Sequence, residues 1–272
     1  MEILFYVLIF IFGTLFGSFF SLAIYRIPLG QNIVYKHSYC PHCNHKLGFL
    51  DMIPIISYIF LNGKCKYCKK PVRARYIFLE VLTGITFLTF FLSLNFAFEN
   101  IEFSKIIYYM VGILYISALF IIAGIDKENK NISKPVLVYG IIVLTVYMLY
   151  LYIVAKANIY KYIIYLFMIL ILILIDTIIL KKKGKTNYNI QIIMLCLFLS
   201  LFTDEMLFVI SAILTLLTIS FILIINKLAE KFNKSKKVDK QVCENLPIGF
   251  YLCTNYIIVL ILSSFIFYEV II

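Results

Sequence analysis

The chain has 272 residues, of which 63% are hydrophobic and only 14% are charged. Soluble domains average about 25% charged residues, so this composition excludes an ordinary soluble protein and indicates a membrane protein. The net charge of +11 would suit a nucleic-acid partner, but the placement of the basic residues points to a membrane topology instead.

Apolar runs of about the 20 residues needed to cross a hydrocarbon core recur along nearly the whole chain. They predict an all-α polytopic membrane protein with about eight transmembrane helices. No signal-peptide cleavage pattern follows the first run, so we expect it to be a retained helix. The sixth run is the shortest of the eight. The expected spans are 4–24, 79–98, 106–125, 135–155, 159–180, 188–203, 205–226 and 248–269.

Lysine and arginine are distributed unevenly among the segments between these spans. One side of the membrane receives 22 of the 25 basic residues, and the other receives only Lys105, Lys156 and Lys161. Because basic loops stay in the cytoplasm, this asymmetry predicts that both termini face outward. It explains the net charge without a nucleic acid, and it predicts that the basic loops contact anionic lipid headgroups.

The cytoplasmic loop between the first two spans, residues 29–78, is the only one long enough to fold by itself. We therefore divide the chain into a first transmembrane helix (1–28), this loop, and a seven-helix membrane domain (79–272). Residues 52–60 of the loop read M-I-P-I-I-S-Y-I-F and are almost entirely apolar. Nine residues are too few to span a bilayer. We expect this segment to dip into the membrane interface or to pack beneath the rest of the loop.

The loop also carries two C-x-x-C pairs, Cys40 with Cys43 and Cys65 with Cys68, separated by 21 residues. This spacing is typical of two zinc knuckles that complete one tetrahedral site. Four sulfur ligands leave no open position, so we expect a structural zinc ion. The alternatives are two disulfides, which a reducing cytoplasm disfavours, or reduced structural thiols. Spare candidate ligands are the three histidines of the loop, His37, His42 and His45.

The order of several motifs resembles that of the type IV prepilin leader peptidases, a family of membrane aspartyl peptidases. The matching elements are Gly17-Ser18-Phe19-Phe20, Tyr25-Arg26-Ile27-Pro28, both cysteine pairs, Ile53-Pro54, Ser57-Tyr58, Gly63-Lys64-Cys65, Arg75-Tyr76, Glu80 and Leu246-Pro247-Ile248-Gly249-Phe250. The resemblance implies an enzyme that removes the leader of type IV prepilins or pseudopilins at the cytoplasmic face of a bacterial inner membrane.

Many members of this family then methylate the new N-terminus with S-adenosylmethionine, in which the 29–78 loop would take part. The resemblance suggests Arg75 and Glu80 as cofactor-binding residues. The plainer alternatives are an interfacial anchor for Arg75 and a charge at the start of a helix for Glu80.

Aspartyl peptidases use two carboxylates that share a proton. The resemblance places the first at Asp126, near the cytoplasmic end of the third span. The second belongs to a G-x-G-D-x-K motif, where residues 184–189 read G-K-T-N-Y-N, so Asn187 takes the position of the aspartate. An amide cannot act as a general base, and such a role contributes roughly 10²–10⁴-fold to the rate. The resemblance therefore implies a weakened or silent peptidase.

Asp176, inside the fifth span, is an alternative second carboxylate. A charged residue in an apolar helix is costly, which by default suggests a function. A protonated acid near the interface, or one bonded to Thr177, is the plainer alternative. Asp204 and Glu205 fall on the outer side in the expected topology and are excluded.

Three functions stay open after the sequence alone: an active prepilin leader peptidase, a catalytically impaired relative that binds pilin precursors or assembly partners, and a zinc-knuckle transporter or scaffold. Neither the identity of the pilin nor the oligomeric state follows from the sequence.

Overall fold

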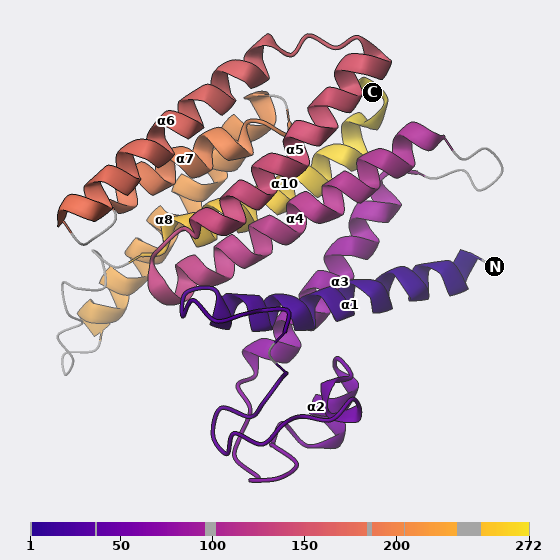
Figure 1. Ribbon diagram of the computed structural model, residues 1–272, viewed down its shortest axis with the longest axis vertical. Helices are drawn as coiled ribbons and strands as arrows, with labels where there is room; N and C mark the ends of the chain where they lie inside the picture. The colour runs from indigo at the N-terminus through magenta and orange to yellow at the C-terminus, as the bar shows by residue number, and fades with distance from the viewer. Residues whose placement is uncertain are drawn as a thin grey trace. The chain divides into compact units, whose positions relative to one another are not determined.

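The computed structural model describes residues 2–35, 37–95, 102–183, 187–203, 205–232 and 246–271. Within these ranges every regular element is a helix, apart from two isolated β-bridges in the cysteine loop (Figure 1). The predicted all-α fold is therefore confirmed. The elements are α1 (Glu2–Arg26), the 3₁₀ helix η1 (Leu50–Met52), α2 (Ile56–Phe60), α3 (Arg75–Ser93), α4 (Phe103–Asn129), α5 (Lys134–Ala155), α6 (Tyr160–Lys183), α7 (Tyr188–Leu199), α8 (Glu205–Phe232) and α10 (Ile248–Ile271).

Seven of the described helices are long and apolar enough to cross a membrane, namely α1, α3, α4, α5, α6, α8 and α10. The expected sixth span, 188–203, is instead α7, a helix of only 12 residues. Twelve helical residues rise about 18 Å, which is less than the roughly 30 Å of a hydrocarbon core. Seven of the eight expected spans are therefore helices of spanning length among the described residues, and the sixth is a shorter apolar helix.

The short helix α7 and the turn after it nevertheless carry the chain from one end of α6 to the other. At one end, the Asn187 N–H donates to Asp176, two turns before α6 stops, at 3.1 Å. At the other end, a Glu205 carboxylate oxygen lies 3.3 Å from both Lys161 Nζ and the Tyr165 hydroxyl, near the start of α6. The chain thus runs back beside α6 before α8 begins, as the sixth expected span requires.

Several helices extend beyond their expected limits, and two of these extensions bear on candidate site residues. α3 begins at Arg75 rather than at 79, and α4 continues to Asn129 rather than ending at 125. Hydropathy marks the apolar middle of a helix and misses polar turns at its ends. As a result, Glu80 lies in the second turn of α3, and Asp126 lies inside α4 rather than beyond it.

The chain divides into two compact units, residues 1–113 with 268–272 and residues 114–267. The predicted boundaries at residues 28 and 78 stay a prediction. The first unit holds α1, the cysteine loop, α3 and the start of α4. The second unit holds the rest of α4, then α5 to α8, and most of α10.

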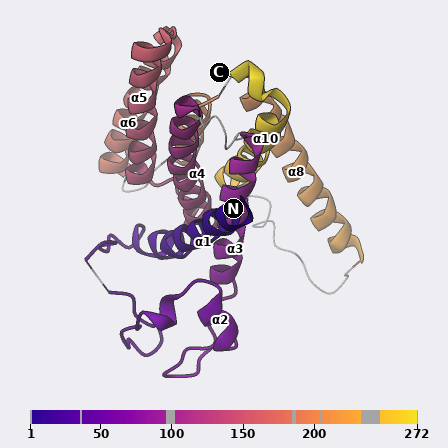
Figure 2. The same cartoon turned by 90° about the vertical axis from the view of Figure 1, so that its right-hand side faces the viewer.

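In the first unit α1 packs closely against α3 (Figure 2). Gly13 and Gly17 of α1, four residues apart, face α3 at the crossing. A Cβ on Gly13 would lie 2.8 Å from Gly84 Cα, and a Cβ on Gly17 would lie 2.7 Å from Glu80 Cα. Small residues at this spacing let two membrane helices approach to backbone contact.

In the second unit an aromatic cluster joins α4, α10 and the C-terminal end of α7. The ring of Tyr115 lies 5.2 Å from that of Phe198 and 4.5 Å from that of Phe202. The Tyr256 hydroxyl donates to the Leu199 carbonyl oxygen at 2.8 Å. These contacts fix the end of α7, whose other end reaches the aspartate site.

Replacing Gly17 with leucine should weaken the pairing of α1 and α3, because the new side chain meets the α3 backbone. Overpacking of this kind costs about 1–3 kcal/mol. We expect a lower thermal midpoint for the full-length protein in detergent, followed by circular dichroism. Gly48→Ala is the control, since its Cβ would meet only Asp51 Oδ2 at an ordinary 3.4 Å. Equal midpoints for the two variants would contradict the close packing.

Candidate metal centre and aspartate site

Two turns of the cysteine loop share one backbone pattern, and each carries a cysteine pair. In each turn the N–H of the first cysteine donates to the carbonyl five residues later, at 3.0 Å for Cys40 and 2.9 Å for Cys65. The residue four positions after that cysteine donates back to it, at 2.8 Å from Asn44 and 3.0 Å from Lys69. Both of these residues have positive φ, 55° and 58°, which reverses the chain. The two turns are therefore equivalent knuckles.

The two knuckles bring their four sulfur atoms together. The Sγ atoms of Cys40, Cys43, Cys65 and Cys68 all lie within 4.8 Å of one another, and those of Cys40 and Cys68 are 3.9 Å apart. Four sulfurs bound tetrahedrally to zinc at about 2.3 Å lie roughly 3.8 Å from one another. The cluster therefore fits a zinc ion, and none of the three loop histidines belongs to it.

Local hydrogen bonds give the thiols of the cluster different acidities. The backbone N–H of Cys68 lowers the pKa of Cys65 to about 7. At Cys43 the backbone N–H of His45 lowers the pKa, but desolvation and the neighbouring thiols outweigh it and raise the pKa to about 11. Because metals bind thiolates, a zinc ion that binds at neutral pH must displace the proton of Cys43.

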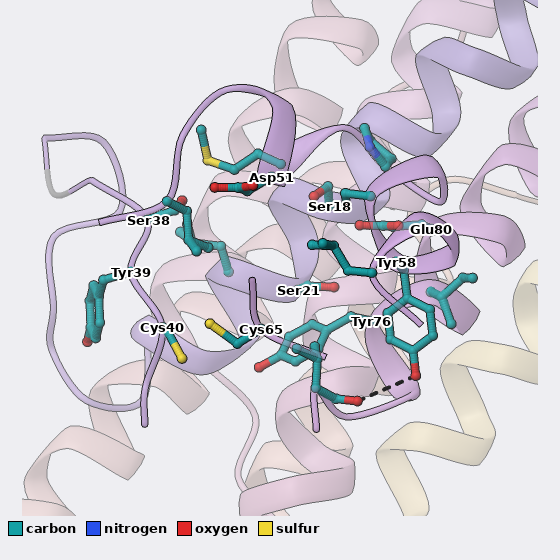
Figure 3. A pocket seen from close by; sticks show the side chains of 18 of the residues that line it. Ser18, Ser21, Ser38, Tyr39, Cys40, Asp51, Tyr58, Cys65, Tyr76 and Glu80 are labelled. Carbon is teal, nitrogen blue, oxygen red and sulfur yellow. Dashed lines mark hydrogen bonds between the residues drawn. The ribbon is translucent and has the colours of Figure 1, made fainter. Parts of the chain in front are cut away.

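A pocket of about 500 Å³ lies next to this cluster in the first unit (Figure 3). Its size falls within the range of ligand cavities, roughly 300–1,000 Å³. Cys40 and Cys65 line it on the side of the knuckles, Ser18 on the side of α1, and Glu80 on the side of α3. Figure 3 shows the side chains of Ser18 and Glu80 close together at one end of the pocket. The exposed lining is mostly apolar, and its charged residues are Arg26, Asp51, Lys64, Lys66 and Glu80.

The Glu80 carboxylate holds a strained turn of the loop. Glu80 is only 8% exposed, and its Oε2 accepts the Ile55 N–H at 2.8 Å. Ile55 has φ 62° and ψ −53°, and the Ile56 N–H reaches back to the Pro54 carbonyl at 2.6 Å. This is a γ-turn with positive φ, which is unfavourable for a β-branched residue. Glu80 therefore ties the loop to α3.

The two arginines near the pocket have other partners. The Arg75 guanidinium lies 5.0 Å from the centre of the Tyr76 ring, and Arg75 does not line the pocket. Arg26, at the end of α1, is only 2% exposed and donates to the carbonyls of Asn32 at 3.2 Å and His37 at 2.9 Å. The structure thus brings Glu80 to the pocket but not Arg75, and Arg26 orders the start of the loop.

Asp126 forms the centre of a separate site in the second unit. Its side chain is fully buried, and Oδ2 accepts the Phe250 N–H at 2.9 Å and the Tyr188 hydroxyl at 3.1 Å. Gly249 permits this approach, because a Cβ there would lie 2.9 Å from Oδ2. Oδ1 is buried and has no hydrogen-bond donor within the described residues. One oxygen of Asp126 is therefore fixed by two donors, while the other has no donor among the described residues.

Asn187 acts as the N-cap of α7. Its Oδ1 accepts the Asn189 N–H at 3.1 Å, the usual role of asparagine at this position. The residues just before it, 184–186, lie outside the described part of the chain. The next residue, Tyr188, is the one that contacts Asp126.

Asp176 is also fully buried, and both of its oxygens have close neighbours. Oδ2 lies 2.8 Å from Lys134 Nζ, a charge contact without the alignment of a hydrogen bond. Oδ1 accepts the Asn187 N–H at 3.1 Å. Within the described residues no hydrogen bond joins Asp176 to Asp126. Asp176 therefore anchors the start of α7 to α6 and to the first residue of α5.

Gln191 of α7, at 1% exposure, is a further polar residue that sequence reasoning missed, as it missed Tyr188. Its Nε2 donates to Asn131 Oδ1 at 2.8 Å, and its Oε1 accepts the Ile132 N–H at 3.1 Å. These bonds fix the turn between α4 and α5, just after Asp126. The sequence did offer a signal for Gln191, because Asn189 and Gln191 are polar side chains in the first turns of an otherwise apolar helix.

The chain resembles known proteins over part of its length. The bacterial peptidase A24 N-terminal domain matches residues 11–94. The prepilin leader peptidase/N-methyltransferase of Myxococcus xanthus is 34% identical over 139 residues, 51% of this chain and 39% of the relative. The proteins of the same name from Klebsiella pneumoniae and Bacillus subtilis are 30% and 33% identical, over 45% and 48% of this chain and 52% and 50% of their own.

These matches confirm the resemblance drawn from the motifs. They span about half or less of the length of the curated relatives. No solved structure matches the chain.

Purified full-length protein should contain one equivalent of zinc, and Cys65→Ser should lose it, because three sulfurs hold the ion less tightly than four. Metal analysis by mass spectrometry measures this directly. The matched control is Cys196→Ser, which changes a cysteine of α7 outside the cluster. Retention of zinc by Cys65→Ser would refute the assignment of that ligand.

Proposed function

We propose, on the premise that residues 11–94 belong to the bacterial peptidase A24 N-terminal domain family, that this multi-pass membrane protein is a prepilin leader peptidase. It cleaves the leader of type IV prepilins or pseudopilins at the cytoplasmic face of a bacterial inner membrane. The observation that carries the proposal is Asp126, a buried carboxylate with one oxygen fixed and the other without a donor.

In this proposal Asp126 serves as the general base. Its Oδ1 accepts a proton from water as the water oxygen attacks the carbonyl carbon of the scissile peptide. The same proton then passes to the leaving nitrogen as the C–N bond breaks, which returns Asp126 to the carboxylate. The Phe250 N–H and the Tyr188 hydroxyl keep Oδ2 in place throughout.

A second candidate is a catalytically impaired relative that binds pilin precursors or assembly partners. The observation in its favour is that the two other candidate catalytic residues, Asn187 and Asp176, bind other groups. Asn187 caps α7, and Asp176 is taken up by Lys134 and by the Asn187 N–H. Neither serves Asp126 as a proton-sharing acid. The transporter or scaffold alternative gains no support from the family match.

We further propose that the first unit methylates the new N-terminus, an activity named in the relatives from three organisms. The pocket beside the cysteine cluster has the volume for a cofactor such as S-adenosylmethionine. Glu80 presents a buried carboxylate to a cationic group there, whereas Arg75 lies off the pocket. Zinc, with four sulfur ligands, is structural in this account.

Asn187→Asp should raise the rate of leader removal from a type IV prepilin in detergent, followed by gel shift. Aspartate caps a helix as well as asparagine does, so the variant restores a carboxylate without disturbing α7. The gain expected for a general acid–base group is roughly 10²–10⁴-fold. Asn189→Asp is the control, because it adds the same charge two residues further on.

The outcomes separate the two candidates. Cleavage by the wild type that Asp126→Asn abolishes supports the enzyme. A silent wild type that Asn187→Asp activates supports the impaired relative. Absence of cleavage from both proteins would contradict a peptidase site at Asp126.

Glu80→Gln should reduce methyl transfer from radiolabelled S-adenosylmethionine to the mature pilin, because the amide removes one of the two acidic groups that line the pocket. The same substitution should leave the rate of leader removal unchanged. Ser21→Ala, a change at another lining residue without charge, is the control. Equal transfer by the wild type and Glu80→Gln would argue against this pocket as the methylation site.

A further inference from the structure

We infer that residues 49–60 of the cysteine loop insert into the inner leaflet of the membrane and bind anionic phospholipid. We call these residues the insertion segment. The inference does not depend on the proposed peptidase activity, and it rests on exposure, helix register and charge.

The insertion segment exposes large apolar side chains that the rest of the first unit leaves uncovered. Their exposed fractions are 82% for Phe49, 72% for Leu50, 51% for Ile56, 60% for Ile59 and 82% for Phe60. Single exposed apolar residues are ordinary, but a group of this kind in one short segment marks a membrane or protein interaction site.

The helix α2 within the segment turns its apolar face outward. Ile56, Ile59 and Phe60 stand at positions i, i+3 and i+4 and share one face of the helix. Ser57 and Tyr58, on another face, line the pocket instead. In water the opposite arrangement is expected, so the outward apolar face indicates an apolar surrounding.

Helix register places the insertion segment beside the part of α1 that lies in the membrane. The Ile55 N–H binds Glu80 at 2.8 Å, and Glu80 Cα lies directly against Gly17. Gly17 precedes the end of α1 at Arg26 by nine residues, or roughly 13 Å along the helix axis. Ile55 is therefore level with the interior of α1 rather than with its exit from the membrane.

The walls of the pocket lead to the same conclusion. Met52 and Pro54 of the insertion segment line it together with Leu15 and Phe19 of α1. Leu15 and Phe19 are 52% and 48% exposed on a helix apolar enough to span a bilayer. The insertion segment thus lies at the level of side chains that face lipid.

The charge around the insertion segment selects the kind of lipid. Residues 29–78 contain eight lysines and arginines but a single acid, Asp51. Exposed basic residues next to the segment or in the adjoining knuckles are Lys46, Lys64, Lys66, Lys69, Lys70 and Arg73. Basic residues beside an inserted apolar segment attract anionic headgroups. This complementarity favours a phospholipid surface over a protein partner.

The experiment uses the absence of tryptophan from the chain, because a single introduced indole then reports on its position alone. Phe49→Trp and Phe60→Trp are made in the full-length protein and reconstituted into vesicles that contain phosphatidylglycerol. Emission should shift to shorter wavelength, and lipids brominated near the headgroup end of their chains should quench it. The control is His42→Trp, an exposed position in the first knuckle, which should emit as in water.

Replacing phosphatidylglycerol with phosphatidylcholine should reduce the quenching at positions 49 and 60. Three results would overturn the inference: indoles at these positions that brominated lipids do not quench, equal quenching at position 42, or equal quenching in phosphatidylcholine. A shift to shorter wavelength without lipid quenching would place these side chains against protein, within the chain or in a second copy, and would also overturn the inference. Both variants replace exposed side chains, so unaltered circular dichroism in detergent verifies their fold.

Discussion

Buried carboxylates that accept a backbone N–H from a neighbouring segment organise both units of this protein. Glu80 binds the Ile55 N–H, Asp126 binds that of Phe250, and Asp176 binds that of Asn187. A carboxylate removed from water is costly unless it is hydrogen-bonded, and a backbone N–H at a turn or a helix start needs an acceptor. Each bond meets both needs, and each ties a turn or the start of another helix to a long helix.

The three carboxylates differ in what remains after this bond is made. The second oxygen of Asp176 faces Lys134, and Glu80 also receives the Ser18 hydroxyl. Among the described residues, Oδ1 of Asp126 is buried with no hydrogen-bond donor; Oδ2 of Asp176 also lacks an aligned donor, but the Lys134 ammonium lies 2.8 Å from it. That difference separates a candidate general base from two structural anchors, one of which also lines a pocket. It is the reason for assigning the peptidase chemistry to one acid.

Hydropathy and cysteine spacing predicted much of the architecture, because both patterns are formed by residues close together in the sequence. The seven helices of spanning length follow from continuous apolar runs, and the four-cysteine cluster follows from two C-x-x-C pairs. The length of α7 was overestimated, because hydropathy continues through the apolar turn at Leu201 and Phe202 after the helix has ended. The contact of Tyr188 with Asp126 joins residues 62 positions apart, and that of Lys134 with Asp176 joins residues 42 apart, so neither was visible in a local pattern.

In the proposed mechanism a single carboxylate, Asp126, performs the proton transfers. The most direct measurement is the pH dependence of leader removal at subsaturating prepilin, compared between the wild type and Asn187→Asp. Two essential ionisations make the plot of rate against pH bell-shaped. A single essential ionisation makes the rate fall on one side only, which gives the plot a single limb. We expect the wild-type rate to fall only on the acidic side, and the rate of Asn187→Asp to fall on both sides of a maximum. A bell-shaped profile for the wild type that Asp176→Asn converts to a single limb would contradict this mechanism.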